Sequence, residues 1–125
     1  MRVLVDTHVL LWALYVPERL QVSAREQILQ ADVFVSAASI WEIGIKSALG
    51  KLAVSAAEVL GAVEPTGFRL LSISGAHAAH AAALPPLHKD PFDRLLVAQA
   101  SLEPLILITN DKLLQGYGSF VTLIS

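Results

Sequence analysis

The sequence predicts an α/β fold, a three-layer α/β/α sandwich with a central, mainly parallel sheet. Short apolar runs, such as residues 3–5 and 105–108, alternate along the chain with longer segments of helical character. These runs are continuously apolar, which is typical of parallel strands that helices cover on both faces. The 125 residues contain no linker, repeat or low-complexity segment, so we expect a single domain spanning residues 1–125.

In the first half of the chain, apolar runs predict the strands and flanking residues predict the helix ends. Pro17 cannot continue a helix and ends the first one, and Ser23 is the expected N-cap of the second. The third helix follows Ser36 and stops at Gly50, a residue favoured just past helix ends, while the fourth ends before Pro65. The predicted order is strand 2–5, helix 7–15, helix 23–30, strand 33–35, helix 37–49 and helix 56–63.

The second half opens with an apolar strand and an alanine-rich helix that Pro85 and Pro86 close. The clearest helix follows. Asp90 is its expected N-cap, Pro91 occupies the first helical position, and Asp93 has the spacing of a capping box. The predicted order is strand 69–72, helix 75–84, helix 90–103, strand 105–108, a helical turn at 111–114 and strand 120–123.

Composition excludes several classes of protein. Cysteine is absent, which excludes disulfides, thiolate zinc sites and thiol nucleophiles and agrees with the reducing cytoplasm in which we expect the protein to act. The apolar content is 54%, yet no unbroken run approaches the roughly 18–20 residues of a membrane span, so we expect no membrane association. From this high apolar content we expect exposed apolar surface, and hence a homodimer or a protein partner.

Four carboxylates stand beside apolar segments near strand ends: Asp6, Glu42, Asp93 and Asp111. The carboxyl ends of parallel strands share one edge of a sheet, so we expect these side chains to converge there. Converging carboxylates repel one another unless a cation lies among them, and hard oxygen ligands suit Mg²⁺ or Mn²⁺. The pattern therefore predicts a metal-dependent enzyme and favours phosphate esters as its substrates.

The formal net charge of −2 does not exclude a polyanionic substrate. The chain has 11 acidic residues against 9 Lys and Arg, and only seven acids remain once the four candidate ligands are set aside. A mildly basic rim around an acidic, metal-binding centre is compatible with nucleic acid but does not require it.

Each acid also has a structural alternative that the residues leave open. Asp6 can act only as a helix N-cap, Asp93 as part of a capping box, and Asp111 as a turn residue. Glu42 lies among apolar neighbours, although one polar stripe on a helix is ordinary. The prediction of a metal site therefore depends on all four acids together.

Four pieces of the chain carry a family resemblance. They are Leu4-Val5-Asp6-Thr7-His8, the segment Ser36-Ala37-Ala38-Ser39-Ile40-Trp41-Glu42-Ile43, the block His88-Lys89-Asp90-Pro91-Phe92-Asp93-Arg94 with the following Ala98-Gln99-Ala100, and Thr109-Asn110-Asp111. In order and spacing, over essentially the whole chain, they resemble a PIN domain and specifically the VapC-type toxins of bacterial toxin–antitoxin pairs. The block that begins at His88 is the most specific of the four.

The resemblance implies a Mg²⁺-dependent endoribonuclease, with Mn²⁺ as an alternative ion, that a cognate antitoxin protein inhibits. The acidic positions of the family fall on Asp6, Glu42, Asp93 and Asp111. Asp6 and Asp93 are then the expected ligands of the first ion. Glu42 would hold that ion through water or act on the attacking water, and Asp111 would bind a second ion or orient a water molecule.

Polar neighbours of the acids are candidate supporting residues. Thr7 and Thr109 can hydrogen-bond a ligand carboxylate or the phosphate, with local capping as the alternative. Asn110 can orient the site or simply form a turn. Asp90 is an extra acid of this subgroup, which we assign to an N-cap or to a position behind the direct ligands.

Basic residues near the acids are the candidate RNA contacts. Arg94, Lys89, His88 and Lys46 are expected to contact RNA phosphates. The alternatives are a solvated charge for each lysine, a structural role for His88, and for Arg94 an ion pair with Asp90 at the i,i+4 spacing.

The first two helices are more apolar than one buried stripe requires. Residues 9–15 and the pair Ile28 and Leu29 can form a groove for a helix or strand of the antitoxin, and a homodimer would compete for similar surface. Core packing is the alternative for most of these residues.

Two other classes of protein share strand-end acids and an α/β sheet. A phosphoacceptor signalling domain needs adjacent acids after the first strand and an Asp after a middle strand, where this chain has Ser36 and Ser72. A haloacid-dehalogenase-like phosphatase needs a second Asp two residues after Asp6, where His8 stands. A catalytically silent PIN-like binding module remains the third alternative.

Overall fold

The structure is a computed structural model that describes residues 1–124. Its five strands form one sheet in the order β3-β2-β1-β4-β5, and every adjacent pair is parallel. The central strand β1 (Arg2–Val5) lies between β2 (Asp32–Ser36) and β4 (Ile106–Thr109), and β3 (Arg69–Leu71) and β5 (Val121–Leu123) form the edges. The prediction of an α/β fold with a central parallel sheet is confirmed.

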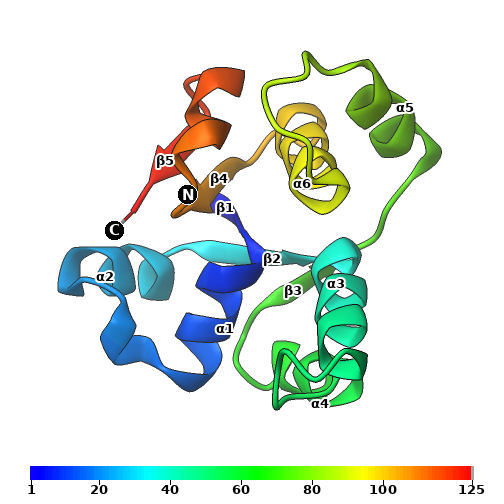
Figure 1. The fold of residues 1–125 in the computed structure, drawn as a ribbon. Helices are drawn as coiled ribbons and strands as arrows, with labels where there is room; N and C mark the ends of the chain where they lie inside the picture. The colour runs from blue at the N-terminus through cyan, green and yellow to red at the C-terminus, as the bar shows by residue number, and fades with distance from the viewer. Residues whose placement is uncertain (125) are drawn as a thin grey trace.

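Helices cover both faces of this sheet and complete the three layers (Figure 1). Side chains of the first four α-helices pack with Val3 and Val5 on one face, and side chains of α6 and η2 pack with Leu4 on the other. The helices are α1 (Thr7–Tyr15), η1 (Pro17–Arg19), α2 (Val22–Gln30), α3 (Ala37–Ala48), α4 (Ala56–Val63), α5 (Gly75–Ala83), α6 (Pro91–Leu102) and η2 (Lys112–Tyr117).

The strands are continuously apolar because, as predicted, both faces of the sheet are buried. Val3, Leu4 and Val5 are all completely buried although successive side chains point to opposite faces. The same holds for Leu107 and Ile108 in β4, which belong to different core clusters. Because helices cover both faces, β1, β2 and β4 carry polar side chains only at their ends.

Some predicted boundaries and caps are wrong. Ser23 does not cap α2, because the helix begins one residue earlier and its N-cap position is Gln21, whose side chain makes no capping bond. Asp90 does cap α6, but the reciprocal half of a capping box is absent, since the Asp90 amide donates to His88 Nδ1. The turn after β4 is longer than predicted, because the 3₁₀-helix η2 continues to Tyr117.

A buried network of hydrogen bonds connects the carboxyl ends of β2 and β3 to the helices α5 and α6. The Ser36 hydroxyl donates to Gln99 Oε1 at 2.5 Å, and Gln99 Nε2 donates to the Ser72 carbonyl at 3.3 Å. His77 Nε2 lies 2.6 Å from Glu103 Oε2 and joins α5 to the end of α6. Gln99 is completely buried, so each of its polar atoms depends on these partners.

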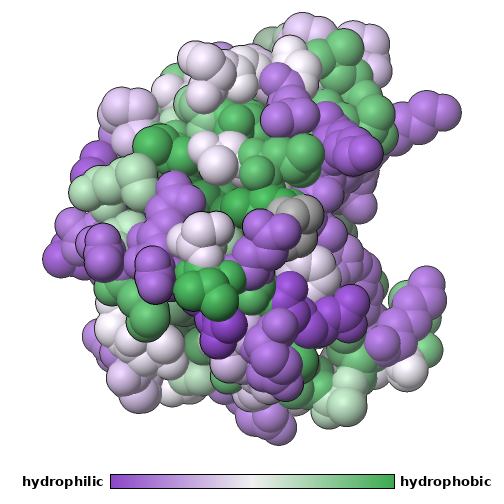
Figure 2. All heavy atoms as spheres, turned by 90° about the vertical axis from the view of Figure 1, so that its left-hand side faces the viewer, coloured by the Kyte–Doolittle hydropathy of each residue, from purple (hydrophilic) through white to green (hydrophobic). Residues whose placement is uncertain are grey.

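The apolar surface that the composition predicts is present. Figure 2 shows hydrophobic residues gathered on the face that carries β5 and η2, where Leu113 is 59% exposed. Other large apolar side chains are exposed on α2 and α3. Within residues 1–124, no helix has both the length and the apolar character needed to cross a membrane.

We predict that Gln99→Ala lowers the free energy of unfolding by about 2–4 kcal/mol, because it opens a cavity and leaves the Ser36 hydroxyl without its acceptor. Urea denaturation of the metal-free protein measures the change. The control is Gln30→Ala on the exposed surface of α2, which should change the free energy by less than about 0.5 kcal/mol. Equal effects of the two substitutions would contradict this role of Gln99.

Candidate metal and active site

A small acidic pocket lies at the carboxyl edge of the sheet, beyond β1 and β4. Its volume is about 80 Å³, and all four predicted acids line it although they come from four separate segments. Of the predicted supporting residues, Thr7, Asn110 and Asp90 also line the pocket, as does Lys46. Thr109 lies behind Asp6, to which its hydroxyl donates a hydrogen bond.

Asp6 occupies the centre of the edge because it directly follows the central strand. It is only 3% exposed, and both of its carboxylate oxygens accept hydrogen bonds, Oδ1 from the Val9 amide at 2.9 Å and Oδ2 from the Thr109 hydroxyl. Burial nevertheless raises the pKa of Asp6 above its ordinary value. Asp6 is therefore both the N-cap of α1 and an acid of the pocket, so the capping and site roles coexist.

Glu42 is buried on α3 and is fixed by partners from two helices. The Thr7 hydroxyl of α1 donates to Glu42 Oε1 at 2.6 Å, and Ser39 Oγ lies 2.9 Å from the same hydroxyl. Lys46, one turn further along α3, forms an ion pair of 2.8 Å with Glu42 Oε2. This hydrogen bond raises the pKa of Lys46, which keeps the ammonium group charged beside the acids.

Asp93 carries the clearest sign of uncompensated negative charge. Burial, together with repulsion from Asp90, Asp6 and Glu42, raises its pKa to about 7. His88 acts in the opposite direction but does not balance these effects. A carboxylate with so high a pKa next to other carboxylates is poorly neutralised by the surrounding protein.

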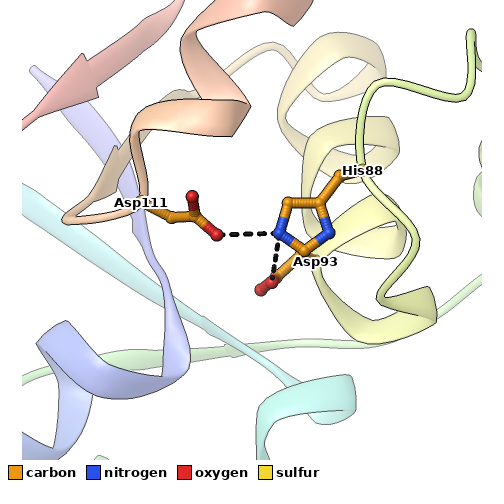
Figure 3. Close-up of side chains that lie close together, drawn as sticks. All are labelled: His88, Asp93 and Asp111. Atoms are coloured by element: carbon orange, nitrogen blue, oxygen red, sulfur yellow. Dashed lines mark hydrogen bonds and ion pairs between the residues drawn. The ribbon is translucent and has the colours of Figure 1, made fainter.

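Asp111 and Asp93 meet at a histidine that the sequence did not assign to the acids (Figure 3). His88 Nε2 lies 2.7 Å from Asp111 Oδ2 and 3.4 Å from Asp93 Oδ2. The other oxygen of Asp111 accepts from the Leu113 amide at 3.0 Å and caps η2. The turn role and the site role of Asp111 therefore also coexist.

The four predicted RNA contacts occupy different environments. Lys46 lines the pocket, Lys89 is exposed on the neighbouring loop, and His88 lies between two of the acids. Arg94 donates to the carbonyl oxygens of residues 81, 84, 85 and 88. Its guanidinium thus holds the loop before α6, and no ion pair with Asp90 is formed within the described part of the chain.

Sequence reasoning did not assign Ser39 or His8 to the site. Ser39 is buried beside Thr7, and its position three residues before Glu42 on a helix was a usable signal. His8 lines the pocket from the first turn of α1, two residues after Asp6. Neither residue was among the predicted supporting residues.

The donor set fits a hard divalent cation. Carboxylate oxygens of Asp6, Glu42 and Asp93 line one pocket, and Lys46, the lysine that lines it, forms its ion pair with Glu42. The raised pKa of Asp93, caused by burial and by the neighbouring acids, indicates that negative charge there is in excess. A divalent cation would remove this excess, whereas soft metals would lack thiolate ligands, since cysteine is absent.

The sequence profile of the PIN domain family matches residues 3–118, which is most of the chain. The chain belongs to the PIN domain family. The matched range includes the four predicted acids, Asp90, all but the first residue of β1, and the whole of β2, β3 and β4. A search of curated proteins finds no match.

Solved structures similar to this PIN domain share its fold at low sequence identity. A toxin–antitoxin complex from Klebsiella pneumoniae has 20% identity and a TM-score of 0.67, with 96% of this chain and 95% of that chain covered. VapBC2 from Rickettsia felis, bound to a DNA fragment from its promoter, has 14% identity, a TM-score of 0.70 and coverage of 98% and 97%. FitAcB from Neisseria gonorrhoeae has 21% identity, a TM-score of 0.65 and coverage of 100% and 97%.

We predict that Asp93→Asn stabilises the metal-free PIN domain at neutral pH. The pKa of Asp93 is raised from 3.8 to about 7 by burial and neighbouring acids, so its ionisation destabilises the folded state as pH rises through this window. The variant should match wild type near pH 4 and exceed it by about 1–3 kcal/mol above pH 7, a range reduced for partial exposure of the group.

Urea denaturation in EDTA at several pH values measures this difference. The control is Asp32→Asn, an exposed carboxylate on β2, which should change stability by less than about 0.5 kcal/mol. A gap between wild type and Asp93→Asn that does not grow between pH 4 and pH 7 would contradict the prediction.

Proposed function

We propose that this PIN domain is a Mg²⁺- or Mn²⁺-dependent endoribonuclease that hydrolyses RNA phosphodiesters, with residues 1–125 as one nuclease domain. The observation that carries the proposal is the convergence of Asp6, Glu42, Asp93 and Asp111 in one pocket where Asp93 has its pKa raised to about 7 by burial and by neighbouring acids. PIN family membership supports the nuclease assignment.

The chain's own residues have distinct roles in this proposal. Asp6 and Asp93 are the direct ligands of the cation, because burial raises the pKa of both carboxylates, which reach the pocket from the end of β1 and the first turn of α6. The bound cation supplies Lewis acidity and neutralises charge at the scissile phosphate. Glu42, held by Thr7 and Lys46, accepts hydrogen bonds from the attacking water and orients it.

Lys46 and Lys89 are the proposed phosphate contacts. Lys46 lines the pocket with a side chain that is 34% exposed, and Lys89 is exposed on the loop before α6, four residues before the pocket residue Asp93. Both can approach a polyanionic backbone that enters the pocket from solvent. Arg94 is left out of this role, because its donors are already bonded to loop carbonyl oxygens.

We propose that a cognate antitoxin binds the groove formed by α1, η1 and α2. The groove measures about 320 Å³ and has mostly apolar walls, including Leu20, Ile28 and the 82% exposed Leu29. Arg25 also lines it, and its buried Nε has no hydrogen-bond partner within residues 1–124. An apolar peptide segment with one acceptor would satisfy both features, and the similar solved structures include toxin–antitoxin complexes.

A second apolar surface supports the proposed homodimer. Trp41, Ile45 and Leu49 are exposed by 65%, 38% and 65%, and their spacing of four residues places them in one row along α3. Trp41 also packs edge-on against Phe92 of α6, with ring centroids 5.5 Å apart. A row of this kind is typical of a helix that pairs with a second copy of itself.

The alternatives are a catalytically silent binding module and a Mg²⁺-dependent phosphoacceptor domain. A silent module has no use for the excess negative charge at Asp93, which destabilises the metal-free protein. A phosphoacceptor domain needs adjacent acids after its first strand and an Asp after a strand in the middle of the chain. Here Asp6 stands alone after β1, β2 ends at Ser36 and β3 is followed by Ser72.

We predict that the purified protein cleaves a mixed RNA pool with Mg²⁺ or Mn²⁺ but not with EDTA, and that Asp6→Asn lowers the rate at least about 100-fold, because a ligand carboxylate is lost. Denaturing gel electrophoresis of the products measures the rate. The matched control is Asp32→Asn, which removes an exposed carboxylate at the start of β2, away from the carboxyl edge, and should retain wild-type cleavage. Cleavage that persists in EDTA would rule out the metal-dependent mechanism.

We predict separate effects for glutamate on the two apolar surfaces. Trp41→Glu should convert the dimer to a monomer by placing charge in the α3 row, while Leu29→Glu should weaken antitoxin binding at least about tenfold and leave the dimer intact. Sedimentation velocity measures the oligomer, and titration with the purified antitoxin measures binding. Each variant is the control for the other, and a monomeric wild type or an exchange of the two effects would contradict the assignment.

A further inference from the structure

His88 occupies a bridging position between two acids that come from different parts of the fold. Its Nε2 lies 2.7 Å from Asp111 Oδ2, at the end of β4, and 3.4 Å from Asp93 Oδ2, on α6 (Figure 3). The imidazole is largely buried, with 13% of the side chain exposed. The three ligand atoms lie within 4.8 Å of one another, so His88 could be a ligand itself or a partner of the ligands.

The hydrogen bond at the other ring nitrogen distinguishes these roles. His88 Nδ1 accepts from the Asp90 amide at 3.0 Å, so in the neutral ring the proton is on Nε2. Nε2 therefore donates to Asp111, with Asp93 close by at 3.4 Å, and has no lone pair to offer a cation. Direct ligation would require the proton on Nδ1, where it would face the Asp90 amide hydrogen.

The loop that carries His88 is held independently of the pocket. Arg94 donates to the carbonyl oxygens of Ala81, Leu84 and Pro85, and to that of His88 itself. The Tyr117 hydroxyl donates to the Pro85 carbonyl at 2.8 Å and accepts from the His88 amide at 3.1 Å. The imidazole is thus placed by α6 and η2 before any ligand arrives.

We propose that His88 is a positioning residue that holds Asp111 and Asp93 at the separation the cation site requires, and that Arg94 acts through it by fixing its loop. This inference rests on the proposed function, since it concerns the same cation site. The Nε2–H fixes one oxygen of Asp111, while the Leu113 amide fixes the other, and its partial positive charge lies between the two carboxylates and reduces their repulsion. Without the imidazole, Asp111 loses a hydrogen-bond donor and Asp93 loses a nearby positive group.

The test is isothermal titration of Mn²⁺ into the metal-free protein, which reports on the site without RNA. His88→Ala should weaken Mn²⁺ binding by about tenfold or more, as expected when a partner of the ligands is removed. His88→Gln places an N–H donor at about the same reach and should stay within about threefold of wild type. A His88→Gln protein as weak as His88→Ala, or a His88→Ala protein that binds as tightly as wild type, would overturn the proposal.

Arg94→Met tests whether Arg94 acts through His88 by fixing the loop that carries it. It should also weaken Mn²⁺ binding, although Arg94 touches none of the acids, and the double variant with His88→Ala should bind within about twofold of His88→Ala alone. Additive losses in the double variant would refute a role of Arg94 through His88. Circular dichroism and urea denaturation of each variant confirm that the comparison is between folded proteins.

Two further variants separate this inference from the proposed function. Lys51→Ala, at an exposed lysine between α3 and α4, should leave Mn²⁺ binding unchanged within about twofold. Asp6→Asn should abolish binding if the proposed site is correct. Wild-type protein that binds no Mn²⁺ would overturn both proposals, whereas normal wild-type binding with an unaffected His88→Ala overturns the role of His88 alone.

Discussion

The structure depends on keeping a carboxylate buried at the end of its central strand. Asp6 follows three completely buried residues, and an ionised group in that place is costly unless its oxygens find donors. The Val9 amide and the Thr109 hydroxyl supply them, one from the first turn of α1 and the other from the end of β4. The capping of α1, the pairing of β1 with β4 and the geometry of the pocket are therefore linked through one side chain.

Two other acids, Asp90 and Asp111, also combine a helix cap with a place in the pocket. Asp111 caps η2 with one oxygen and meets His88 with the other, and Asp90 caps α6 with its side chain while its amide fixes the tautomer of His88. Asp6, Asp90 and Asp111 are thus each held by a bond that also defines the start of a helix. Preorganisation of this kind keeps the acids close together although they repel, and it explains why burial and mutual repulsion raise the pKa of Asp93.

The proposed partners occupy different parts of the molecule. The acidic pocket lies at the carboxyl edge of the sheet, the groove lies between α1, η1 and α2, and the exposed row lies along α3. Helices α1 and α3 each contribute to the pocket through Thr7 and Glu42 and also to one apolar surface. A protein that binds either surface therefore contacts a helix that positions an acid, which gives partner binding a direct physical route to the pocket.

The sequence by itself determined the parallel α/β fold, the PIN resemblance and the four predicted acids of the site, because local patterns along the chain are enough to predict these features. Continuous apolar runs report burial on both faces, and acids placed after them reach one edge of the sheet whatever the details of packing. Helix N-caps were predicted less well. Asp90 caps α6 as predicted, but Ser23 does not cap α2, because the choice of N-cap depends on how the preceding loop enters the helix.

Only the tertiary structure decided the roles of residues whose partners are distant in the chain. Arg94 looked like a phosphate contact, yet it binds carbonyl oxygens of residues 81–88, and His88 meets an acid 23 residues away. No spacing rule gives the direction of a long side chain or the path of a loop between two helices. Those depend on how α5, α6 and η2 pack together, and packing is a property of the whole fold rather than of any segment.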